Sequence, residues 1–136
     1  MLIIDAGPII AAASAHDRHH SECAELLRSA PGPLIVPALV VTEVVYFLAA
    51  RFGTDAERAF LGSLTSGSIL VEPVAAAEWQ RIDELVDTYR DLPLGTVDAS
   101  VVALCERLGQ TTVASLDHRH LSFVRPSHCN HLTLIP

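Results

Sequence analysis

Short apolar runs alternate with amphipathic segments along the whole chain. The apolar runs predict buried strands, and the segments in which apolar side chains recur with a helical period predict helices. The expected strands are 2–5, 34–36, 69–71, 111–114 and 132–135. The expected helices are 8–13, 20–29, 38–52, 54–66, 75–90 and 96–108. This alternation predicts an α/β fold with three layers, in which a central, mainly parallel sheet of about five strands is flanked by helices.

The helix expected at 75–90 illustrates how the pattern assigns faces. Trp79, Ile82 and Leu85 fall on one face of this helix. Glu78 and Arg81 fall on the other side. Because an amphipathic helix buries its apolar face against the core, we expect Trp79 to be buried and Glu78 to be exposed to solvent.

Length and composition limit the class of protein. A chain of 136 residues, half of them hydrophobic, is expected to fold as one domain spanning 1–136. No apolar run approaches the ~20 residues needed to cross a bilayer, and the N-terminus lacks the features of a signal peptide. The three cysteines match neither a zinc motif nor a disulfide pattern, which is typical of a cytoplasmic protein.

The balance of charge argues mildly against a broad surface for nucleic acid. Nine basic residues against 16 acidic ones give a net charge of −7, whereas nucleic-acid-binding domains are usually basic. That argument weakens if several acids bind metal, and the acidic surface also suits a basic partner protein. All nine basic residues are arginines, which excludes any chemistry that requires a lysine.

Four acidic residues lie in unusually apolar stretches of the sequence: Asp5, Glu43, Asp98 and Asp117. Asp5 and Asp117 follow expected strands, and parallel strands bring their C-terminal ends to one edge of a sheet. Glu43 and Asp98 fall on expected helices, and their apolar neighbours predict inward-facing side chains. Because clustered carboxylates repel one another and need a cation, they predict a site for a hard divalent ion, Mg²⁺ or Mn²⁺.

Such a site indicates a reaction class. A divalent ion activates water and neutralises charge on a phosphate under attack, and it requires no histidine general base. Phosphodiester hydrolysis is therefore the predicted reaction. Three of the acids also have a purely structural interpretation: Asp5 as a helix cap, Asp117 as the start of a turn, and Asp98 as a complement to a helix dipole.

Two other α/β classes share an acid at the end of the first strand. A phosphorelay receiver domain would also use a lysine near a later strand end, and this chain contains no lysine. A haloacid-dehalogenase-like phosphatase would need a second aspartate two residues after the first, and that position is Gly7. No glycine-rich dinucleotide motif or P-loop is present, so a nucleotide cofactor is not expected.

The acids occur within motifs whose order and spacing resemble a known family. These are Leu2-Ile3-Ile4-Asp5, Thr42-Glu43, the stretch 91–100 (DLPLGTVDAS), the stretch 116–121 (LDHRHL) and Val124-Arg125-Pro126. Each motif alone is weak, but together they cover nearly the whole chain. On these residues the chain resembles a PIN-domain ribonuclease, and specifically a VapC-type toxin of a type II toxin–antitoxin system.

The resemblance implies a fold, an activity and partners. It implies the PIN-like form of the α/β fold and a cytoplasmic, Mg²⁺- or Mn²⁺-dependent endoribonuclease that cuts a structured RNA and inhibits translation. Asp5, Glu43, Asp98 and Asp117 would be both its metal ligands and its catalytic acids. A cognate antitoxin would bind and inhibit it, and the toxin would be a homodimer that has no membrane contact.

Arg119 is the candidate for contact with the RNA. A guanidinium binds phosphate through two hydrogen bonds and needs no protonation step. The flanking His118 and His120 are further candidates for phosphate contact. The alternative is that Arg119 is a surface arginine paired with one of the many acids.

One position departs from the family pattern. The family commonly carries Ser, Thr or Asn within two residues of the first acid, where this chain has Ala6-Gly7. The polar group near the metal is then expected to come from Thr42, Thr96 or Ser115. The same departure, together with the acidic charge, favours the alternative function: a non-catalytic or weakly active PIN-fold module for regulation or binding.

Overall fold

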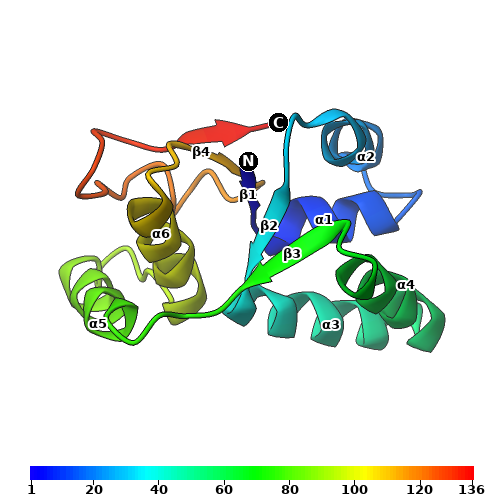
Figure 1. Ribbon diagram of the computed structural model, residues 1–136, viewed down its shortest axis with the longest axis horizontal. Helices are drawn as coiled ribbons and strands as arrows, with labels where there is room; N and C mark the ends of the chain where they lie inside the picture. Colours follow the sequence, from blue (N-terminus) through cyan, green and yellow to red (C-terminus); the bar gives the residue numbers. More distant parts are fainter.

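Helices enclose a parallel sheet in the computed structural model, which describes all 136 residues (Figure 1). The strands are β1 Leu2–Ile4, β2 Leu34–Pro37, β3 Ile69–Glu72, β4 Thr112–Ala114 and β5 Thr133–Ile135. The helices are α1 Ala6–Ala13, α2 His20–Ser29, α3 Ala38–Phe52, α4 Thr54–Thr65, α5 Glu78–Thr88 and α6 Thr96–Leu108. The predicted α/β fold is therefore confirmed, with small differences at the ends of several elements.

The sheet has the strand order β3-β2-β1-β4-β5, and every neighbouring pair is parallel. Helices α5 and α6 pack together on one side of it, whereas α1, α2, α3 and α4 form a group on the other side (Figure 1). Because all five strands run in one direction, their C-terminal ends share one edge of the sheet. That edge is where open α/β sheets bind ligands.

The core forms around the first and central strand, β1. Ile3 and Ile4 are fully buried, since helices cover both faces of the sheet and leave no strand face for solvent. On α3, Val40, Val44 and Leu48 are also fully buried. Their spacing of four residues places them on one helix face. That face fixes the orientation of α3, which carries Glu43.

Helix α5 differs from its prediction in length and in its buried face. It spans Glu78–Thr88 rather than 75–90, and the backbone N–H of Ala75 donates to Glu78 Oε2 at 2.5 Å just before it. Glu78 is only 8% exposed, because Arg107 Nε of α6 donates to its other oxygen at 3.0 Å. Trp79 is 50% exposed. Both face assignments were wrong. For Glu78 the reason is its ion pair with Arg107 of another helix, a partner that leaves no periodic signal in the sequence of α5.

Two further expectations concern the helices and the cysteines. None of the six helices combines the length and apolar character needed to cross a membrane. Cys23 and Cys105 are buried and Cys129 is half-buried, and all three are free thiols. Burial of the Cys105 thiol raises its pKa to about 12, so this cysteine packs as a small apolar side chain.

Candidate functional site

A cleft of about 610 Å³ opens at the C-terminal edge of the sheet. It is lined by Asp5, Ala6, Gly7, Arg18, Glu43, Asp98, Leu116, Asp117, His118, Arg119 and His120. Ala6 and Gly7 form the first turn of α1, and Asp98 lies in the first turn of α6. Helix N-termini carry partial positive charge, so these two turns favour acidic side chains at this position.

Asp5 lines the cleft and is only 6% exposed. Its backbone N–H donates to the carbonyl of Ala114 at 2.9 Å, which extends the pairing of β1 with β4 by one residue. Its Oδ1 accepts the N–H of Ala6 at 2.7 Å, and its Oδ2 accepts the hydroxyl of Ser115 at 2.8 Å. Asp5 therefore caps α1, as one interpretation of the sequence expected, and also faces the cleft.

Ser115 connects the first and last acids of the chain. Ile4 pairs with Ala114 in parallel register, so Asp5 and Ser115 leave the two strands side by side. The Ser115 hydroxyl donates to Asp5 and accepts the backbone N–H of Asp117 at 3.1 Å. Because a hydroxyl offers one proton and two lone pairs, one buried side chain orients both acids.

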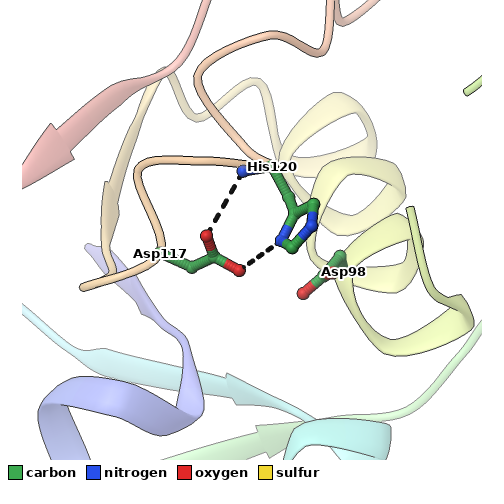
Figure 2. A group of neighbouring side chains, drawn as sticks. All are labelled: Asp98, Asp117 and His120. Carbon is green, nitrogen blue, oxygen red and sulfur yellow. Dashed lines mark hydrogen bonds and ion pairs between the residues drawn. The ribbon is translucent and has the colours of Figure 1, made fainter. Parts of the chain in front are cut away.

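Asp117 is held by its own turn. Its Oδ1 accepts the backbone N–H groups of Arg119 at 3.0 Å and His120 at 3.2 Å. Its Oδ2 lies 2.6 Å from Nδ1 of His120 (Figure 2). Partial burial raises the pKa of Asp117, but these hydrogen bonds outweigh it and hold the pKa below its usual value. The hydrogen bond to Asp117 is the main cause that raises the pKa of His120.

The other three acids have raised pKa values. For Asp5 the main cause is burial, with a smaller contribution from the charge of Asp117, and hydrogen bonds from Ser115 and Ala6 oppose the shift. For Asp98 burial comes first and the charges of Asp5 and Asp117 second. Asp5, Asp98 and Asp117 therefore form one electrostatic cluster with Glu43, and ionising one member makes it harder to ionise the next.

Glu43 reaches this cluster from α3 and was expected to face inward. That expectation was wrong, because Glu43 is exposed and lines the cleft rather than the core. Partial desolvation at the cleft wall, followed by the charges of Asp5 and Asp98, raises the pKa of Glu43. The apolar residues on either side of Glu43 in the sequence belong to other faces of α3.

The donor set fits a hard divalent cation. No arginine forms an ion pair with any of the four acids, and His120 is the one basic side chain bonded to one of them. Ligand atoms of Asp98, Asp117 and His120 lie within 4.8 Å of one another. A divalent ion bound to carboxylate oxygens would remove the repulsion that adds to burial in raising the pKa values of these acids.

The remaining predicted residues fall into two groups. Ser115 and Arg119 lie at the site, and the Arg119 side chain lines the cleft without an ion pair. Thr42 and Thr96 are exposed and do not line the cleft. Thr42 Oγ1 instead donates to the carbonyl of Leu39 at 2.6 Å. Thr96 is the first residue of α6, and the N-cap position belongs to Gly95.

The departure at positions 6 and 7 has a packing cause. A Cβ at Gly7 would lie 3.2 Å from Cβ of Leu116, which is closer than an ordinary van der Waals contact, so a side chain there would require Leu116 to shift. Ala6 is itself buried. The hydroxyl next to the first acid comes instead from Ser115, on the neighbouring strand end.

Sequence reasoning missed one residue of the cleft and the contact made by another. Arg18, in the segment between α1 and α2, lines the cleft from outside every motif. The sequence offered no signal for it, because only tertiary structure brings this segment to the strand ends. His120 was expected at most to contact phosphate, whereas it bonds to Asp117. The three-residue spacing of these two within a turn is the signal that could have found this contact.

Comparison with known proteins places this arrangement among relatives. The family model described as PIN domain matches residues 2–125. Ribonuclease VapC26 of Mycobacterium tuberculosis is 35% identical over 135 residues, which is 99% of this chain and 100% of that protein.

Two crystal structures share the fold. VapC20 of M. tuberculosis, a sarcin-ricin loop cleaving toxin, matches with a TM-score of 0.81 and 23% identity, over 87% of this chain and 91% of that one. FitAcB from Neisseria gonorrhoeae matches with a TM-score of 0.63 and 17% identity, over 100% of this chain and 97% of that one.

Proposed function

The chain belongs to the PIN-domain family as a VapC-type endoribonuclease toxin, and we propose that it cuts a structured RNA with a divalent ion, Mg²⁺ or Mn²⁺. Asp5, Glu43, Asp98 and Asp117 would hold this ion. One observation carries the proposal: four carboxylates from distant parts of the chain meet in one cleft, and no arginine forms an ion pair with any of them. When bound, such an ion activates water and stabilises the charge that develops on a phosphate.

The side chains around the cleft have distinct proposed roles. Asp5 is fixed by hydrogen bonds to both oxygens, so it would present the same lone pairs to each substrate. Ser115 would hold Asp5 and Asp117 in a constant relation, because it bonds to both. Fixed ligands of this kind avoid the cost of reorganising the site during the reaction.

Arg119 and Arg18 are the proposed contacts to the RNA backbone. Both line the acidic cleft, yet neither guanidinium forms an ion pair there. Four other arginines of this chain, Arg28, Arg81, Arg90 and Arg107, do pair with acids. The Arg119 guanidinium makes no hydrogen bond, whereas Arg18 Nε donates to His19 Nε2 at 2.9 Å and its two terminal nitrogens remain unpaired. Each arginine can therefore still offer two N–H groups to a phosphate. They would also offset the repulsion between the RNA and a chain of net charge −7.

Substitution of these arginines should weaken RNA binding without changing the cleavage site. We expect Arg119→Ala or Arg18→Ala to raise the dissociation constant for RNA about tenfold. The slope of the logarithm of the binding constant against the logarithm of the salt concentration should fall by the amount that corresponds to about one phosphate contact. RNA binding is measured by fluorescence anisotropy. All variants also carry Asp98→Asn, so that the RNA is not cleaved during the measurement. Arg58→Ala is the matched control, since Arg58 is exposed on α4 and lies outside the cleft. Equal losses of RNA affinity in all three variants would reject the proposed contacts.

VapC-type toxins pair with antitoxins, and the proposed partners are a cognate antitoxin and a second copy of this chain. Large apolar side chains are exposed on α3 and α4, with Tyr46 78% exposed and Phe52 and Leu61 also in contact with solvent. Exposed apolar surface of this kind is typical of protein interfaces. The proposed location of the complex is the cytoplasm. Light scattering of the isolated chain tests the homodimer, and a mass equal to one chain would reject it.

RNA cleavage by the purified, antitoxin-free chain tests the proposed function against the alternative of a binding module. Total RNA is incubated with the chain in Mg²⁺ and in excess chelator, and the new RNA ends are mapped. The sarcin-ricin loop is the first region to inspect, because it is the target of the similarly folded VapC20. We expect cuts inside one structured RNA in Mg²⁺ and none in chelator. Absence of cuts in both conditions would favour the binding module, and cuts that survive chelation would reject the metal site.

A further inference from the structure

His120 occupies a position that the four acids alone do not explain. Its ring lies beside the carboxylates of Asp117 and Asp98 in the wall of the cleft (Figure 2). Nδ1 is 2.6 Å from Asp117 Oδ2, and ligand atoms of the three residues lie within 4.8 Å of one another. Two ligands of an octahedral ion with bonds of about 2.1 Å lie roughly 3–4 Å apart. The observed spacing therefore needs only a small adjustment to surround one ion.

We propose that His120 supplies a nitrogen ligand to the ion held by Asp98 and Asp117, so that this site prefers Mn²⁺ to Mg²⁺. This inference rests on the proposed function and specifies its cofactor. Imidazole nitrogen suits transition-metal ions, whereas Mg²⁺ strongly prefers oxygen ligands. Two carboxylates and one imidazole form a mixed nitrogen and oxygen set, which a site built from acids alone would not provide.

The local structure leaves the ring available for this role. The backbone N–H of His120 donates to Asp117 Oδ1 at 3.2 Å, so the turn itself holds the residue next to that acid. The side chain is 30% exposed, and its ring has no hydrogen-bond partner other than Asp117. An ion that enters the cleft therefore has only one ring contact to replace.

Two histidine variants separate ligation from positioning. In His120→Asn the amide nitrogen can take the place of Nδ1 as a donor to Asp117, but an amide is a much weaker ligand than imidazole for Mn²⁺. His118→Asn is the matched control. His118 is exposed on the same turn and lines the same cleft, but it does not belong to the group of three close ligands.

Pulsed electron paramagnetic resonance of Mn²⁺ added to the metal-free protein tests the assignment directly. We expect coupling to an imidazole nitrogen in the wild type and in His118→Asn, and no such coupling in His120→Asn. Calorimetry should give a Kd for Mn²⁺ about tenfold higher in His120→Asn, while the Kd for Mg²⁺ changes less than about twofold.

The outcomes separate this inference from the proposed function. Bound Mn²⁺ without nitrogen coupling in the wild type would overturn the role of His120, and metal-dependent RNA cleavage would still support the proposed function. Equal weakening of Mn²⁺ and Mg²⁺ binding in His120→Asn would also overturn it, because that pattern belongs to a residue that only positions Asp117. If the wild type bound neither ion, both the inference and the metal-dependent function would be rejected.

Discussion

Replacing Asp98 with asparagine should lower the rate of RNA cleavage by at least about a hundredfold. Loss of a residue that only supports a metal ligand already costs up to about a hundredfold in activity, and Asp98 is proposed to bind the ion directly. The same substitution should raise the melting temperature of the metal-free protein at pH 7. Function and stability are expected to change in opposite directions. Burial and the neighbouring negative charges make ionised Asp98 costly to the fold, and the same negative charges attract the ion. Cleavage assays and thermal unfolding of the same samples check both effects.

The stability effect has a defined dependence on pH. Burial and the charges of Asp5 and Asp117 raise the pKa of Asp98 above the value of 3.8 for an ordinary aspartate. The ionised carboxylate therefore destabilises the folded state at pH values above its folded-state pKa. This cost shrinks as the pH falls through the folded-state pKa, because the folded protein then binds the proton. The advantage of Asp98→Asn should vanish once the pH is below the pKa of the unfolded chain.

A matched control keeps this prediction specific. Asp83 is an exposed acid on α5 outside the cleft, so Asp83→Asn should leave both cleavage and melting temperature near the wild-type values. Cleavage by Asp98→Asn within about twofold of the wild-type rate would contradict the proposed role of Asp98. A lower melting temperature of metal-free Asp98→Asn at pH 7 would contradict the electrostatic account of the cleft.

The strands and helices could be predicted because each one has its own local pattern of apolar and polar residues. Ile3 and Ile4 lie in an apolar run that a buried parallel strand requires, and α3 repeats its buried residues with helical spacing. The failure at Glu78 has a different origin. Glu78 is buried because it meets Arg107 from a helix distant in sequence. Periodicity within one helix has no access to such a partner.

The part of the candidate site that lies at the ends of strands could be predicted from the sequence. Asp5 and Asp117 could be assigned to one edge because all strands were expected to be parallel. Ser115 was one of three candidates for the polar group near the first acid, but the sequence could not single it out, because its bond to Asp5 requires that β4 lie next to β1 in a specific register. Arg18 enters the cleft through tertiary packing alone. Residues placed by strand order or by loop packing are therefore invisible to motif spacing.

Binding of a divalent ion should strongly stabilise the folded protein. An ion that binds only the folded state adds about 2.7 kcal/mol at a concentration one hundred times its Kd. For this chain the effect should be large, because the ion also relieves the repulsion among Asp5, Glu43 and Asp98.

Ser115→Ala should bind the ion more weakly, by about tenfold, since Asp5 loses a hydrogen bond that holds it. Ser122→Ala is its control, because Ser122 is exposed and donates to the backbone of His118.

The central claim is that the carboxylate cleft holds a divalent ion, and thermal unfolding at increasing concentrations of Mn²⁺ or Mg²⁺ tests it most directly. The melting temperature of the metal-free wild type should rise continuously with the concentration of the ion. Asp98→Asn should show almost no rise, and Ser115→Ala should need about ten times more ion for the same rise. An unchanged melting temperature of the wild type at millimolar ion, or an equal rise in Asp98→Asn, would contradict the claim.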